Sequence, residues 1–192
     1  MSPVGPAQGG AEGGKCSVVT LSGPPGSGTT TAARLVAAET GLKYVNTGAI
    51  FRDMARERGM TLNDFGKLAN ENPEIDLELD DRQVAIARAG GILLEGRLAG
   101  FMVRRAGISA VKVCLVAPRE ARMQRVSSRD RLDFHEAMRL SEEREADERT
   151  RFIEFYGYDL LDTSIYDLVL DSSLLSPEEI SRRIVAMLRE RS

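Results

Sequence analysis

The 192-residue sequence contains no tryptophan, one histidine and two cysteines, and it has no long apolar run. A membrane-spanning helix needs about 20 consecutive apolar residues, so we expect no membrane partner. Cys16 and Cys114 lie far apart in apolar, strand-like runs, which favours buried thiols in a reducing cytoplasm over a metal site. His135 lies in a charged segment and is expected at the surface, not as a general base.

Lysine is also scarce. It occurs only at positions 15, 43, 67 and 112, and arginine makes up the rest of the 26 basic residues. Arginine favours bidentate contacts with phosphate and carboxylate groups. The formal net charge of -3 argues against a general nucleic-acid binder. We therefore expect small anionic ligands and no nucleic-acid partner.

The chain is long enough for one domain, and its 42% apolar content can supply a core. Residues 1–15 are rich in Gly, Pro and Ala, lack the apolar segment of a secretory signal, and are expected to form a disordered lead-in. Short apolar runs then alternate with helical stretches, which predicts an α/β fold with a parallel sheet covered on both faces. We expect strands at 16–21, 42–46, 91–95, 111–117 and 166–172.

Helices are expected between and after these strands, at 29–40, 48–59, 61–72, 73–90, 133–156 and 176–192, and residues 118–129 connect the fourth strand to the helix at 133–156. Gly41 would stop the first of them, Thr61 and Pro73 would start two others, and Ser176 with Pro177 would start the last. Two helical excursions, 47–89 and 127–160, interrupt the α/β rhythm. They follow carboxyl ends of strands, or the helices beyond them, and this is the edge where open α/β sheets bind ligands.

The segment SGPPGSGTTT has the spacing of a phosphate-binding loop: Gly23, four residues, Gly28, and a hydroxyl residue at Thr30. We assign ATP phosphate binding to Gly23, Pro24, Pro25, Gly26, Ser27, Gly28, Thr29, Thr30 and Thr31, with Thr30 as the Mg²⁺ ligand. Thr29 occupies the position that holds lysine in this motif. A plain Gly/Pro turn between strand and helix is the alternative, but the expected strand before and helix after favour the loop.

Arginines are the candidates to supply the charge of the absent lysine. Arg125, Arg129 and Arg131 cluster near an expected loop, and Arg144, Glu148 and Arg151 share one face of the following helix. We predict that Arg125, Arg129, Arg131, Arg144 and Arg151 close over the phosphates and act in catalysis. The alternative for the helix is a solvated face laced with ion pairs.

Two further segments end expected strands at the ligand-binding edge. In NTGAIFR (46–52), Thr47 can cap the next helix, Gly48 permits close backbone approach, and Arg52 can fork a phosphate. In EGRLAG (95–100), Arg97 follows a buried apolar strand and needs an anionic partner or solvent.

In order along the chain, GPPGSG-x-TT, TGAIFR, EGRLAG, READERTR and SIYDLVLDSS resemble the motifs of cytidylate kinases of the compact archaeal type, from about residue 17 to 187. The resemblance implies a P-loop NTPase-type fold, here a parallel five-stranded sheet with helices on both faces. It implies one kinase domain over 16–192, with an acceptor-binding helical insert at 47–89 and a lid region at 127–160.

The resemblance also implies a reaction: transfer of the γ-phosphoryl group of ATP to CMP or dCMP, with Mg²⁺, by a cytoplasmic monomer. It places CMP against Thr47, Gly48, Ala49, Arg52, Arg97, Glu148 and Arg151. Arg52 would hold the monophosphate, and Glu148 would lie near the cytosine, because a carboxylate can accept a hydrogen bond from the exocyclic amine of that base. Glu replaces Asp at both acidic positions of the family's R-D-x-x-D-x-x-R motif.

Two alternatives remain open. One is another nucleoside monophosphate kinase, acting on AMP or UMP; adenylate kinases share the GPPG loop but carry D-G-F-P-R where this chain has EGRLAG, which favours the cytidylate hypothesis. The other is a non-catalytic nucleotide-binding module whose loop has lost its lysine.

Overall fold

A computed structural model describes residues 18–191, and of Arg144 only the backbone. The expected lead-in and Cys16 lie outside the described residues. The elements follow in the order β1 (Val18–Ser22), α1 (Thr29–Thr40), β2 (Lys43–Asn46), α2 (Thr47–Glu57), α3 (Leu62–Glu71), α4 (Pro73–Ala89), β3 (Ile92–Glu95), α5 (Ala99–Arg105), β4 (Val111–Val116), α6 (Arg119–Asp130), α7 (Phe134–Tyr156), β5 (Leu168–Asp171) and α8 (Pro177–Glu190).

The strands form one five-stranded sheet in the order β2-β3-β1-β4-β5, and each neighbouring pair is parallel. The predicted sheet is confirmed. Glu95 at the end of β3 lies in register with Leu21 on one side and Asn46 on the other. Parallel strands bring their carboxyl ends to one edge, so the polar residues that end β1, β2 and β3 meet there.

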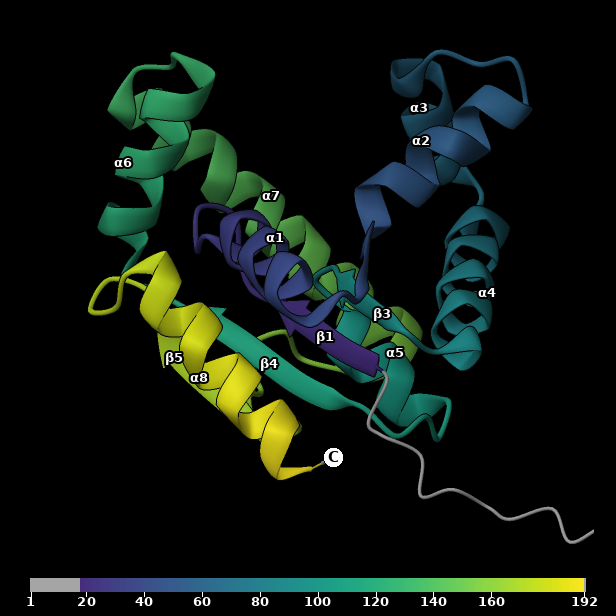
Figure 1. Cartoon of the computed structure of the whole chain (residues 1–192). Coiled ribbons are helices and arrows are strands. Elements are labelled where there is room, and N and C mark those ends of the chain that lie inside the picture. Colours follow the sequence, from purple (N-terminus) through teal and green to yellow (C-terminus); the bar gives the residue numbers. More distant parts are fainter. Residues whose placement is uncertain (1–17, 192) are drawn as a thin grey trace, which may run out of the picture.

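Helices cover both faces of the sheet, as predicted (Figure 1). On one face, Val36 of α1 and Ile184 of α8 are fully buried against the sheet. On the other face, Ala87 of α4 and Val103 of α5 pack against β1 and β3. Burying each large aliphatic side chain contributes about 1.5–3 kcal/mol, so the two layers hold the carboxyl edge of the sheet in place.

The expected helix boundaries agree closely with the structure. Gly41 ends α1 in the left-handed conformation with φ 74°. Thr61 caps α3 through a hydrogen bond from the Asp64 amide, and Pro73 occupies the first turn of α4. Ser176 forms a capping box at α8. Helix α5 was not expected.

The two excursions are helical and flank the carboxyl edge of the sheet. Helices α2, α3 and α4 connect β2 to β3, and α6 and α7 connect β4 to β5. In Figure 1, α6 and α3 stand on opposite sides above the sheet. The expected loop around Arg125 and Arg129 is wrong: α6 continues to residue 130, and only three residues separate it from α7. None of the helices in residues 18–191 is both long and apolar enough to span a membrane.

Candidate active site

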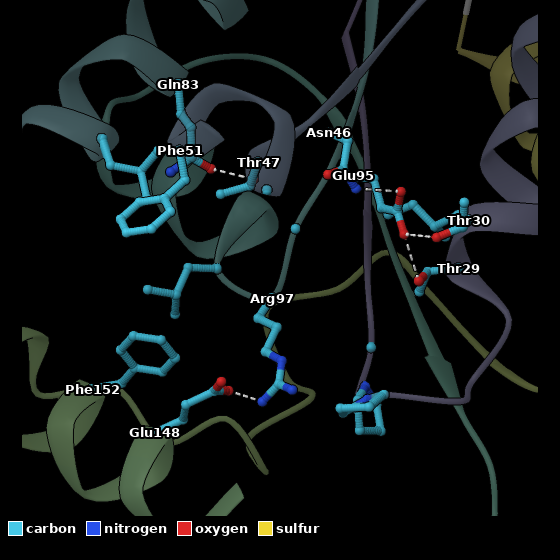
Figure 2. Close-up of a pocket in the computed structure, with 18 of the residues that line it drawn as sticks. Thr29, Thr30, Asn46, Thr47, Phe51, Gln83, Glu95, Arg97, Glu148 and Phe152 are labelled. Atoms are coloured by element: carbon cyan, nitrogen blue, oxygen red, sulfur yellow. Dashed lines mark hydrogen bonds and ion pairs between the residues drawn. The ribbon is translucent and has the colours of Figure 1, made fainter. Parts of the chain in front are cut away.

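A cavity of about 940 Å³ opens at the carboxyl edge of the sheet. Its walls come from the phosphate loop, from the end of β3, from α2, α3 and α4 of the first excursion, and from α6 and α7 of the second. Ligand pockets in proteins commonly measure about 300–1,000 Å³. Figure 2 shows its two sides: Glu95 with Thr29 and Thr30 on one, and a space bordered by Phe51 and Phe152 on the other.

The phosphate loop has the backbone that anion binding requires. Gly26 and Gly28 adopt φ 79° and 86°, a left-handed conformation that disfavours side chains. A Cβ at Gly26 would also lie 2.5 Å from the carbonyl oxygen of Arg122. No side chain among the described residues caps the start of α1, whose first turn lines the cavity, and a helix N-terminus at this place favours an anion.

Most of the residues predicted for the ATP phosphates line the cavity, namely Gly23, Pro24, Pro25, Gly26, Gly28, Thr29, Thr30 and Thr31. Ser27 does not. Its side chain is fully buried, and its amide closes the turn by donating to the Pro24 carbonyl at 3.1 Å. Ser27 therefore shapes the loop from beneath.

Glu95 lies at the centre of the donor side, the part of the cavity next to the phosphate loop, and it was not among the predicted site residues. Its Oε1 accepts hydrogen bonds from the hydroxyls of Thr29 and Thr30, each at 2.7 Å. Its Oε2 accepts from Asn46 Nδ2 at 2.8 Å and from the Tyr44 hydroxyl. Four uncharged donors thus hold one buried carboxylate, and within the described part of the chain no lysine or arginine forms an ion pair with it.

Tyr44 is held in its donating form. Burial, together with the hydrogen bond to the Glu95 carboxylate, raises the pKa of Tyr44 to about 12. The phenol therefore stays protonated at neutral pH and keeps its hydrogen bond to Glu95. The position of Glu95 at the carboxyl end of a buried strand was the sequence feature that could have identified it.

On the acceptor side, the structure brings together Thr47, Gly48, Arg97, Glu148 and Arg151, which all line the cavity. Arg97 forms an ion pair with Glu148 (Figure 2). Arg151 lies 3.6 Å from the Asp76 carboxylate. Ion pairs therefore join α7 to EGRLAG through Arg97 and to α4 through Asp76.

Three details on α2 differ from expectation. Asn46, not Thr47, caps the helix by accepting from the Ala49 amide at 3.1 Å, because Thr47 already has helical geometry. The Thr47 hydroxyl instead donates to Gln83 Oε1 at 2.8 Å. Ala49 and Arg52 are not among the residues that line the cavity; Arg52 is exposed beside Gly48. Its phosphate-binding role stays a prediction.

The acceptor space has apolar walls and a polar end. Phe51, Leu79, Leu98, Phe152 and Tyr156 line it, and Figure 2 shows Phe51 and Phe152 on either side of it. Aromatic rings with one polar edge suit a flat heteroaromatic ligand. The space is therefore shaped for a base.

Helix α4 supplies two carboxylates to this space. Tyr156 donates a hydrogen bond to Asp80 Oδ2 at 2.5 Å, and Gln83 Nε2 donates to Asp80 Oδ1 at 3.3 Å. Burial, with the neighbouring Asp76 charge, raises the pKa of Asp80 to about 6 against the opposing Tyr156 hydrogen bond. Burial also raises the pKa of Asp76, although Arg151 opposes this. Neither residue was predicted from the sequence.

The arginines expected to replace the lysine are in different places. Arg125 lines the cavity and donates to the Gly26 carbonyl at 3.0 Å and the Ser172 carbonyl at 2.7 Å. Arg129 also lines it, with an exposed side chain paired to Asp130 at 2.6 Å. Arg131 ends α6 in a left-handed conformation, is exposed and is not among the lining residues. The Arg144 side chain lies outside what the structure describes.

Another arginine supports the loop. Arg122 is buried, donates to the Pro25 carbonyl at 3.0 Å, and pairs with Glu145 of α7 at 2.6 Å. The phosphate loop, α6 and α7 are therefore joined through one guanidinium. Taken as a whole, the cavity has a phosphate-binding half and a base-sized half, an arrangement that can bring two nucleotides together.

The sequence pattern of the cytidylate kinase-like family matches residues 18–174. The chain belongs to this family. Among curated relatives, the cytidylate kinase of Methanopyrus kandleri is 49% identical over 84% of this chain and 88% of that protein. Those of Pyrococcus abyssi and Methanocaldococcus jannaschii are 47% and 46% identical, over 86% and 81% of this chain and 90% and 88% of theirs.

Solved structures similar to this family member agree on the fold. An uncharacterized protein from Eubacterium ventriosum has a TM-score of 0.70 at 12% identity, over 91% of this chain and 99% of that one. The shikimate kinase of Acinetobacter baumannii, in complex with shikimate, has a TM-score of 0.53 at 14% identity, over 91% and 93%. At these identities the likeness concerns the fold alone, a P-loop kinase fold.

Proposed function

We propose that the protein transfers the γ-phosphoryl group of ATP to CMP, and to dCMP, giving ADP and the pyrimidine diphosphate. The observation that carries the proposal is one cavity with two halves, a phosphate loop on one side and an aromatic-walled space with Arg97 and Arg151 on the other. The names of the curated relatives support CMP as the acceptor. The carboxylates around the base-sized space favour a base that donates hydrogen bonds.

The donor half fits a Mg²⁺ ion bound together with ATP. Mg²⁺ prefers oxygen ligands and is commonly held by one or two carboxylates plus substrate phosphates. Thr30 Oγ1 and Glu95 Oε1 are oxygen atoms that could serve as such ligands. They lie 2.7 Å apart in the wall of the cavity. When bound, the ion would neutralise phosphate charge that a lysine at position 29 would otherwise neutralise.

Phosphoryl transfer depends mainly on positioning and charge neutralisation. The loop amides would hold the donor phosphates, and Arg125 would fix the loop through the Gly26 carbonyl. Arg97 and Arg151 would hold the acceptor phosphate once it displaces their carboxylate partners. Arg129, exposed at the end of α6, lines the cavity and would approach the transferring group once it leaves Asp130. We assign no general base.

A non-catalytic nucleotide-binding module is the rival from another class. Such a module needs the loop but not the second half of the cavity, where Phe51, Arg97 and Phe152 gather. An adenylate or uridylate kinase differs in the acceptor base only.

A coupled assay with ATP, Mg²⁺ and each of CMP, dCMP, UMP and AMP tests the proposal. We expect the highest kcat/KM with CMP or dCMP. A comparable or higher value with AMP would contradict the assignment, and ATP binding with no transfer to any monophosphate would favour the binding module.

A further inference from the structure

A chain of hydrogen bonds crosses the base-sized half of the cavity. Thr47 donates to Gln83 Oε1 at 2.8 Å, Gln83 Nε2 donates to Asp80 at 3.3 Å, and Tyr156 donates to Asp80 at 2.5 Å. Thr47 begins α2, Gln83 and Asp80 lie on α4, and Tyr156 ends α7. These hydrogen bonds therefore join three helices that surround the base-sized half of the cavity.

This series of hydrogen bonds determines where unused hydrogen-bond acceptors lie in the cavity. Gln83 is 2% exposed, and its amide oxygen is occupied by Thr47, so its amide nitrogen faces Asp80. Asp80 accepts one hydrogen bond on each oxygen, and an ionised carboxylate has about four acceptor positions. Asp80 lines the cavity, so acceptor capacity remains on the side of the ligand.

The other carboxylates of the acceptor half are paired with guanidinium groups. Glu148 forms an ion pair with Arg97, and Asp76 lies 3.6 Å from Arg151. Among the described residues, Asp80 forms no ion pair with lysine or arginine; its partners are the neutral groups of Tyr156 and Gln83. Asp80 can therefore accept from a ligand without displacing a cation.

We propose that Asp80 is the specificity-determining residue of the acceptor site, accepting a hydrogen bond from the exocyclic amine of cytosine. This inference rests on the proposed CMP kinase function. Uracil presents a carbonyl oxygen in place of that amine, which would face the carboxylate with no proton between them. Thr47 and Gln83 act as positioning residues, because they hold Asp80 through its Oδ1 atom.

The protonation state of Asp80 should make the selectivity for CMP over UMP depend on pH. Its raised pKa of about 6 arises from burial and from the Asp76 and Asp81 charges of its own helix, opposed by Tyr156 of α7 and by Arg105 of α5. Above pH 7 the group is an acceptor and rejects uracil. Below pH 6 it carries a proton and can donate to the uracil carbonyl, so selectivity for CMP should fall as the pH falls.

The test measures kcat/KM for CMP and for UMP in four proteins: the wild type, Asp80→Asn, Glu148→Gln and the control Asp81→Asn. Asp81 is the exposed neighbour of Asp80 on α4 and carries the same charge. A charge-assisted hydrogen bond is worth about ten- to hundredfold in binding. Asp80→Asn should lower the CMP to UMP ratio at pH 7.5 by about that factor, whereas Asp81→Asn should leave it unchanged.

The ratio does not depend on the active fraction of a preparation, so partial misfolding of a variant cannot produce the effect. If Asp80→Asn does not fold, the wild-type ratio measured from pH 8 to pH 5.5 serves instead and should fall through pH 6. A ratio unchanged in both measurements, or one that moves in Glu148→Gln alone, overturns the role of Asp80. A wild type that prefers AMP to CMP contradicts the proposed function, which is a separate outcome.

Discussion

At the scale of single residues, the threonine at position 29 changes how charge is arranged around the phosphate loop. A lysine there would place a cation beside Glu95. Instead, the hydroxyls of Thr29 and Thr30 share the same carboxylate oxygen at 2.7 Å. Glu95 lies next to the site for triphosphate, where a bound divalent cation is the natural counter-charge to the phosphates.

The two threonines are therefore predicted to be unequal. Thr29→Ala removes one neutral hydrogen bond to Glu95, worth about 0.5–1.5 kcal/mol, and should lower kcat by less than about tenfold. Thr30→Ala removes the same contact and also the proposed Mg²⁺ ligand. It should raise the Mg²⁺ concentration that gives half-maximal ATP binding, measured by titration calorimetry. An inactive Thr29→Ala protein, with Thr30→Ala near wild type, would contradict this division.

At the scale of elements, helices α6 and α7 are connected to the phosphate loop by two arginines that act differently. Arg122 is buried and joins Pro25 to Glu145 of α7. Arg125 lies in the cavity wall and joins Gly26 to Ser172 after β5. The first contact supports the loop through α7, and the second lies where a donor nucleotide would touch it.

The Arg122–Glu145 pair should contribute pH-dependent stability. Burial acts to raise the pKa of Glu145, but the hydrogen bonds from Arg122 and Ser141 and the charge of Arg119 outweigh it and hold the pKa below its ordinary value. The contribution is therefore complete above the unfolded-state value of 4.5 and is lost as pH falls below it. Glu145→Gln should cost about 1.5–3 kcal/mol at pH 7.

Thermal denaturation at pH 7 and pH 3.5 measures this effect. The difference in Tm between the wild type and Glu145→Gln should be several degrees at pH 7 and should shrink at pH 3.5. Glu143→Gln is the matched control on the same helix, because the Arg139–Glu143 pair is exposed and such pairs contribute little. An equal fall in Tm in the two variants, or a fall in Glu145→Gln that does not depend on pH, would contradict a stabilising role for the Arg122–Glu145 pair.

Substitutions of the arginines of α6 should have different kinetic effects, depending on where each side chain lies. Arg125→Ala should raise the KM for ATP by more than about tenfold and spare the KM for CMP, because a charge-assisted contact on the donor side is lost. Arg129→Ala should lower kcat. Arg131→Asn should stay near wild type, since Arg131 does not line the cavity and asparagine tolerates its left-handed backbone. Steady-state kinetics with each substrate varied in turn measure these effects. A large loss of kcat or kcat/KM in Arg131→Asn would contradict the prediction.

At the scale of the whole molecule, most of the fold could be predicted because the apolar strands and helix caps are local patterns. The strand 111–117 and the Ser176 cap are read directly from neighbouring residues, and the structure has both. Helix α5 was missed because it is short and carries no side-chain cap. The loop expected near Arg129 failed because α6 continues through two serines that favour turns as well as helices.

The site was less predictable, because its contacts connect distant segments. The phosphate loop is local and was found, whereas Glu95 needs Tyr44, Thr29 and Thr30 brought to it by sheet order. Asp80 was hidden in a charged helix, and only packing of α4 against α7 sets it opposite Tyr156. A sequence pattern gives the residue types at a site but not which carboxylate has a cation for a partner.

The central claim is that this cavity phosphorylates cytidine monophosphate in preference to other monophosphates. The most direct test is competition: the purified protein with γ-labelled ATP, Mg²⁺ and equimolar CMP, UMP and AMP, with the labelled diphosphates separated at early times. We predict that the label enters CDP at least about tenfold more than UDP, as one charge-assisted contact to the exocyclic amine requires, and that it enters CDP faster than ADP. Label that enters ADP as fast as CDP would contradict the claim.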